Sequence, residues 1–415
     1  MGARHGPAEG VTGDRTALRV MLGVLVPLLV ASVVGLVAVW PSGASFEGDE
    51  RGGIVDLSGT EQVPGEVLAA TADLCEGAPD EREPDGSIPL DSLCAEALVR
   101  VLQGPEAGDV VTVPLPPQLV QAGIGPGERV VLGRNLPTTV EGTEVEADTG
   151  QVVYSFVDFD RAQPLLLLAG LFAVLVVAIG RLRGAAAIAG LALTYAAIAY
   201  VVLPALREGE DPVLVALSVA VPLMTAVLYL AHGLSTRTTA ALSGTVFGLL
   251  ATTGLAVWAT RAADLTGLTS EDAYVLSTAT TGADLRGIVL CGLVVAGLGI
   301  LNDVTITQVS AVWEIRALAP TAGFRELFRG GMRVGRDHLA STVYTIAFAY
   351  AGAALPTLLL LGLYGQPLEQ VVTSGAVAEE IARTAVGSIG MILAIPVTTA
   401  VAAVSVGRAA PLTAR

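Results

Sequence analysis

Between Gly297 and Glu314, an apolar, glycine-bearing run acquires polar residues before it is long enough to cross a bilayer. Asp303 is followed by Thr307, Ser310 and Glu314 at four, seven and eleven residues, which places all four side chains on one face of a helix. An aspartate at the centre of a membrane helix costs roughly 3 kcal/mol, and such residues often line an ion pathway. We therefore predict a polar stripe, including Asn302, that is buried in a membrane. The alternative is a bond from Asp303 to Asn302, Thr305 or a neighbouring helix.

A second polar cluster lies near the start of a later apolar segment. Asp337, Ser341, Tyr344 and Thr345 share a helical face there, and we expect Ser341 and Thr345 to donate to Asp303. Next to Asp337, His338 would complete a proton relay, because the ordinary pKa of histidine is close to neutral. A plain interfacial histidine is the alternative.

Signatures of common enzymes are missing from the chain. There is no glycine-rich phosphate loop ending in Lys, no His-Glu-x-x-His helix and no Gly-x-Ser-x-Gly turn. We therefore expect neither catalysis nor a cofactor, and the sequence does not identify a metal site.

The elements that carry these residues are membrane helices. With 415 residues, 53% of them hydrophobic and 15% charged, and a mean hydropathy of +0.67, the chain falls outside the soluble globular class. Eight apolar segments have the length that a bilayer requires. They are residues 20–40, 164–180, 184–203, 213–231, 239–259, 287–307, 339–363 and 384–404.

The arginines predict the orientation of these spans, since the chain has no lysine. Short loops rich in positive charge stay in the cytoplasm. The distribution of the arginines therefore places residues 1–19 and 408–415 in the cytoplasm, and residues 41–161 outside the membrane. The first span has the charge pattern of a signal peptide, but its apolar core is too long for one, so we predict a membrane anchor.

Residues 41–161 are predicted to form an acidic β domain outside the membrane. This segment holds 23 Asp and Glu against 6 Arg, a net charge of −17, which disfavours binding to nucleic acid. Five short strands are expected in a small barrel or sandwich, at residues 67–72, 97–102, 109–115, 128–132 and 151–159. Residues 126–127 and 148–150 are predicted turns. Cys75 and Cys94 are expected to form a disulfide that would contribute about 3 kcal/mol.

Two further features bear on the helices. Residues 316–338 carry five arginines, and we predict an amphipathic helix at the inner membrane surface, starting at Pro320 and stopping at Gly330-Gly331. Pro356 and Pro396 fall inside predicted spans and are expected to kink them or to free a backbone carbonyl.

The motif residues resemble a known family. The stretch from Gly297 to Ile306, Ser310-Ala-Val-Trp-Glu314, Gly335-Arg-Asp337 and the run from Thr342 to Gly352 are similar to the core of the YibE/F family of bacterial membrane proteins. The resemblance covers residues 152–406, including Val157-Asp-Phe-Asp-Arg161. It implies a multi-pass protein of the bacterial cytoplasmic membrane, with an outer N-terminal domain and a seven-helix membrane domain at residues 162–407, but no known substrate. The alanine-rich, lysine-free composition suggests an actinobacterial source.

Two functions agree with these features. The first is a transporter or permease-like protein whose polar stripe conducts a proton or another small ion or solute. The second is a non-transporting scaffold or sensor whose outer domain binds a partner and whose polar stripe joins helices. The lipid bilayer is a partner in both cases, and the sequence leaves self-association open.

Overall fold

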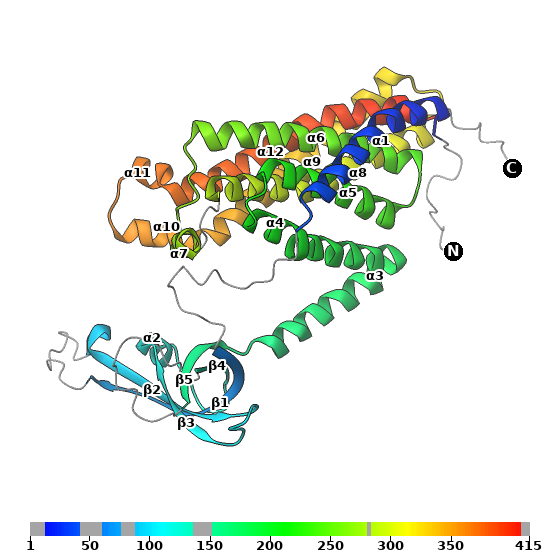
Figure 1. Cartoon of the computed structure of the whole chain (residues 1–415). Helices are drawn as coiled ribbons and strands as arrows, with labels where there is room; N and C mark the ends of the chain where they lie inside the picture. Colours follow the sequence, from blue (N-terminus) through cyan, green and yellow to red (C-terminus); the bar gives the residue numbers. More distant parts are fainter. Residues whose placement is uncertain (1–12, 42–59, 76–87, 136–151, 280–283, 408–415) are drawn as a thin grey trace. The chain divides into compact units, whose positions relative to one another are not determined.

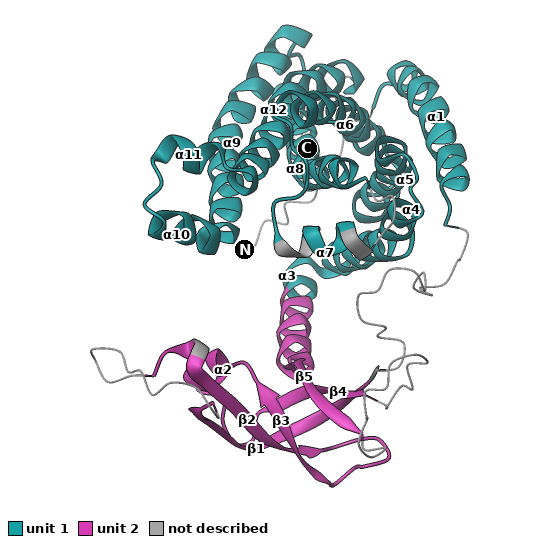
Figure 2. Ribbon diagram, turned by 60° about the vertical axis from the view of Figure 1, so that its left-hand side comes forward, with its two compact units in different colours: residues 1–47, 176–415 teal, residues 48–175 magenta. Residues whose placement is uncertain are grey.

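The computed structural model describes residues 13–41, 60–75, 88–135, 152–279 and 284–407 (Figure 1). The chain divides into two compact units, residues 48–175 and residues 1–47 with 176–415 (Figure 2). The tail predicted at 408–415, the turn predicted at 148–150 and most of segment 1–19 lie outside the described residues.

The first unit is built on one antiparallel sheet of five strands. They are β1 (Thr60–Leu74), β2 (Leu93–Val101), β3 (Val110–Leu115), β4 (Arg129–Asn135) and β5 (Val153–Phe159), in the order β3-β2-β1-β4-β5. The two edge strands, β3 and β5, also contact each other, so the sheet curls into a half-barrel. Alternate residues of β2 are buried, as in a sheet with one face on a core. Of the two folds predicted, the structure is nearer to the barrel.

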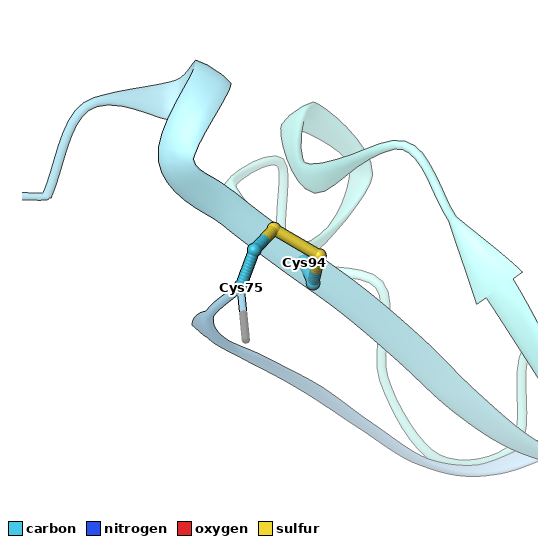
Figure 3. The surroundings of a disulfide bond; sticks show 2 residues. All are labelled: Cys75 and Cys94. Atoms are coloured by element: carbon cyan, nitrogen blue, oxygen red, sulfur yellow. A yellow bond between two sulfur atoms is a disulfide. The ribbon is translucent and has the colours of Figure 1, made fainter. Parts of the chain in front are cut away.

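A disulfide and a cluster of side-chain hydrogen bonds connect parts of this sheet unit. Cys75 and Cys94 are joined by a disulfide at the end of the β1–β2 pair (Figure 3). Arg134 is buried, and its guanidinium donates to Glu106 at 2.7 and 2.9 Å, while the Tyr154 hydroxyl donates to the same carboxylate at 3.0 Å. The Arg134 hydrogen bond lowers the pKa of Glu106 below its ordinary value.

The second unit is a bundle of helices. Its centre consists of α6 (Thr236–Ala262), α8 (Leu285–Leu318) and α12 (Gly375–Ser405), each of which contacts the other two. On their flanks lie α5 (Pro212–His232), which also packs on α1 (Arg15–Ala38), and α9 (Phe324–Ala353) (Figure 1). The short helices are α2 (Pro117–Gln121) in the sheet unit, and α4 (Leu203–Arg207), α7 (Glu271–Ala279), α10 (Leu355–Leu363) and α11 (Leu368–Thr373) in the bundle.

The described residues contain six helices long and apolar enough to cross a membrane, or seven if the bent pair α9–α10 counts as one. Eight spans were predicted. The difference lies in residues 164–180 and 184–203, which the structure joins in a single helical stretch, Ala162–Arg207, that begins with α3 (Ala162–Ala197). Arg181 interrupts that stretch with a φ of 54°, so two helical arms meet there. Gly184 lies in this turn, where a Cβ atom would be 2.2 Å from the Val176 carbonyl oxygen.

The structure contains the predicted helix, but the prediction that it stops at Gly330-Gly331 was wrong. Helix α9 starts at Phe324 and continues without a break to Ala353. The two glycines serve close packing instead, because Cβ atoms on Gly330 and Gly331 would lie 2.9 Å from Ile315 and 2.7 Å from Thr399. The bend comes later: α9 and α10 are inclined by 58°, and Pro356 lies in the first turn of α10. Pro396 lies inside the continuous helix α12.

Candidate functional site

Helix α8 carries the predicted stripe, but the structure turns that stripe outward. Asp303 and Glu314 are exposed on the surface of the bundle, and Thr307 and Ser310 are half-buried. The buried face of α8 lies further round the helix and includes Thr305, Gln308, Val312 and Arg316. The described helices of this chain therefore do not cover the Asp303 stripe, and its burial in a membrane stays a prediction. Periodicity showed which residues share a face, but it could not show which face the neighbouring helices cover.

Asp303 lies near the middle of the 34-residue helix α8, opposite His338 of α9. The Asp303 Oδ2 and His338 Nε2 atoms are 3.4 Å apart, and the side chains are 64% and 30% exposed. The two helices run side by side in opposite directions, as the contacts of Gln308 with Gly331 and of Gly330 with Ile315 also show. The structure thus places a carboxylate and an imidazole together halfway along an apolar helix.

The partner of His338 differs from the one predicted. Asp337 was expected to pair with it, but Asp337 is exposed and the close carboxylate belongs to Asp303. The expected donors Ser341 and Thr345 are exposed, and the Thr345 hydroxyl donates at 3.1 Å to the Ser341 carbonyl of its own helix. Adjacent helical positions point about 100° apart, so His338 and Asp337 cannot share one direction.

The other residues of the predicted stripe have local partners. The Thr307 hydroxyl donates to the Asp303 carbonyl at 2.8 Å, and the Ser310 hydroxyl donates to the Ile306 carbonyl at 2.6 Å. Arg237, at the start of α6, donates to the Ser310 hydroxyl and attracts the Glu314 carboxylate. Next to Asp303, the Asn302 Oδ1 atom is buried without a hydrogen-bond partner among the described residues.

Sequence reasoning missed the residue that joins three helices, Gln308. This side chain is 2% exposed, and its Nε2 atom donates to the Gly331 carbonyl at 2.6 Å and to the Thr399 hydroxyl at 2.7 Å. Gly335 makes room for it, because a Cβ atom there would lie 2.9 Å from the Gln308 Oε1 atom. The signal in the sequence was Gly331-x-x-x-Gly335, the small-residue spacing of close helix contacts.

Threonines continue this buried polar seam between α6, α8 and α12. Thr245 and Thr305 share a hydrogen bond of 2.8 Å. Thr252 packs against Gly297 and Gly390, and Thr398 packs against Gly244, at distances that would leave no space for a Cβ atom on any of these glycines. We call Thr245, Thr252, Thr305, Gln308, Thr398 and Thr399 the polar seam. The three helices are therefore in close contact at Gly244, Gly297 and Gly390.

A third polar group lies at the start of α12. Glu379 and Glu380 lie before the predicted span 384–404, but α12 begins at Gly375 and includes both. Glu379 is buried and accepts from the Thr269 hydroxyl at 3.1 Å, and Glu380 lies 3.5 Å from Arg383. Among the residues that the structure describes, no three His, Cys, Asp or Glu side chains gather as metal ligands would.

The comparison with protein families gives a match to the YibE/F-like protein family over residues 168–408, which is more than half of the chain. The chain belongs to the YibE/F-like family. The resemblance predicted from the motifs is thereby confirmed for the helical part, and its segment Val157–Arg161 lies outside the matched residues. No curated protein and no solved structure matches the chain. The apolar helices of this family member are compatible with a location in a membrane.

Proposed function

We propose that this YibE/F-like protein is a permease-like membrane protein in which Asp303 and His338 pass a proton, or hold a small cation, along the exposed polar face of α8. The observation that carries the proposal is the 3.4 Å approach of the His338 imidazole to Asp303, which lies near the middle of the apolar helix α8. A carboxylate at this depth is unfavourable in lipid, so water or protein must cover it.

The chemistry of the pair suits a proton. A carboxylate and an imidazole can each take up a proton and release it again. A tightly held metal ion would need more ligands than these two side chains supply. The polar seam packs closely against glycines of the neighbouring helices, so we take the exposed Asp303 face as the candidate route.

The setting that we propose for this route follows from the arginine distribution. The protein would lie in the cytoplasmic membrane of a bacterium, with both termini inside and the acidic unit outside. In the membrane, water or a second copy of the chain would cover the face of α8 around Asp303. The route involves no catalytic step and no cofactor.

The test is proton flux into proteoliposomes that contain the full-length protein, followed with a trapped pH-sensitive dye. We expect Asp303→Asn and His338→Gln each to reduce flux at least tenfold, while the protein level and melting temperature stay unchanged. Asp337→Asn is the matched control, because it removes a neighbouring exposed carboxylate that does not approach His338. Flux that is the same in Asp303→Asn and in the unmodified protein would contradict the proposal.

A scaffold or sensor is the second candidate, and the polar seam favours it. Gln308 bonds to Gly331 and Thr399, and Thr245 bonds to Thr305, so these side chains join neighbouring helices, as expected of a protein whose membrane part is only structural. In that case a deletion strain should be rescued by Asp303→Asn but not by a chain that lacks residues 42–160. A transporter should give the opposite result for Asp303→Asn.

A further inference from the structure

The first half of α9 presents a concave surface that the proposed proton route does not use. Phe328, Arg329, Met332, Arg333 and Arg336 line a concavity of about 310 Å³. Their spacing of one, four, five and eight residues places them on one side of the helix. We call these five residues the arginine pocket.

The charge of the arginine pocket is not balanced by nearby acids. Within the part of the chain that the structure describes, none of the three pocket arginines forms a salt bridge, and all three are exposed. The closest acids in sequence do not neutralise them. Glu326 accepts the backbone N–H of Gly323 at 2.9 Å, and Asp337 makes no ion pair with Arg333 or Arg336. The pocket therefore offers three guanidinium groups to an anion.

The lining has two chemical characters, which restrict the ligand. Guanidinium groups bind phosphate oxygens through paired, charge-assisted hydrogen bonds. Phe328 and Met332, both half-buried, form the apolar part of the wall. A free inorganic anion would use only the arginines, whereas a lipid would use both parts. The volume is at the lower end of ligand pockets, which suits a headgroup whose acyl chains continue outside it.

We propose that the arginine pocket binds the phosphate headgroup of an anionic phospholipid, with an acyl chain along Phe328 and Met332. Basic pockets on membrane proteins recognise anionic headgroups in this way, and each arginine near an anionic surface contributes about fivefold in affinity. The site is independent of the Asp303–His338 pair, so it stands or falls separately from the proton route.

The experiment is native mass spectrometry of the full-length protein taken from vesicles of phosphatidylglycerol and phosphatidylcholine in equal amounts. We expect the unmodified protein to retain phosphatidylglycerol selectively. Arg333→Gln should weaken retention about fivefold, and the triple change Arg329→Gln, Arg333→Gln, Arg336→Gln by at least tenfold. Arg325→Gln is the matched control, since it lies on the same helix and outside the pocket. If the triple variant does not fold, the comparison of Arg333→Gln with Arg325→Gln decides.

Two further measurements distinguish a bound lipid from a bound free anion. Met332→Ser keeps all three arginines and should still weaken retention of phosphatidylglycerol. Inorganic phosphate at millimolar concentration should not displace the bound lipid. Equal retention of the two lipids, equal loss in Arg325→Gln and Arg333→Gln, or displacement by inorganic phosphate would overturn the proposal.

Discussion

Asp303 and Gln308 lie on the same helix, five residues apart, and have opposite surroundings. Gln308 is buried, and its amide donates to two neighbouring helices, whereas Asp303 is exposed and meets one imidazole. A buried amide with its bonds made stabilises a helix bundle, while an exposed carboxylate in the same apolar setting does not. At the scale of residues, we therefore assign structure to Gln308 and function to Asp303.

The stability of the bundle should depend on Gln308. The change Gln308→Leu removes both donors and leaves the Gly331 carbonyl buried without its side-chain partner, so we expect the free energy of unfolding to fall by about 1 to 2 kcal/mol. Reversible unfolding of the detergent-solubilised protein measures this. Thr307→Val is the control, because Thr307 bonds only within its own helix, and it should change stability by less than about 0.5 kcal/mol. Equal effects of the two changes would refute a special role of Gln308.

At the scale of elements, the packing of α9 against α8 and α12 depends on its glycines. A Cβ atom on Gly335 would lie 2.8 Å from Ile395 and 2.9 Å from Gln308, so Gly335→Ala forces the helices apart. We expect a loss of about 1 to 3 kcal/mol, as for other overpacked sites, seen as a lower melting temperature. Gly352→Ala, on the same helix in open space, should be neutral or slightly stabilising. A stable Gly335→Ala protein would show that these helices do not pack this closely.

Sequence patterns predicted most elements and few of their contacts. The length of the apolar runs located the long helices. The five strands were found with boundaries shifted by up to seven residues, the largest shift being at the start of β1. The break at Arg181 was expected as a loop between spans, because Arg181 and Arg183 interrupt the apolar run. The unbroken course of α9 through Gly330-Gly331 could not be predicted, because glycines mark both helix ends and close packing. The Asp303–His338 pair also escaped prediction, since it joins two helices whose register only the fold determines.

At the scale of the whole molecule, the arginine distribution predicts the orientation. Because we propose that the acidic unit lies outside and the C-terminus inside, we expect an alkaline phosphatase fusion at residue 160 to be active and one at residue 415 to be inactive. A green fluorescent protein fused at the same positions is the control and should give the reverse pattern. Activity of both phosphatase fusions would contradict a cytoplasmic C-terminus.

The central claim is that water reaches the Asp303 face of α8. The direct measurement is the rate at which a charged, water-soluble thiol reagent modifies single cysteines in the membrane-embedded protein, with Cys75, Cys94 and Cys291 replaced by serine. We expect cysteines at positions 303, 307 and 314 to react quickly, a cysteine at the buried position 305 to stay unmodified, and one at Leu166, which is exposed on an apolar helix, to react slowly. Position 303 reacting as slowly as position 166 would mean that water does not reach the aspartate, and the proposed proton route would then be wrong.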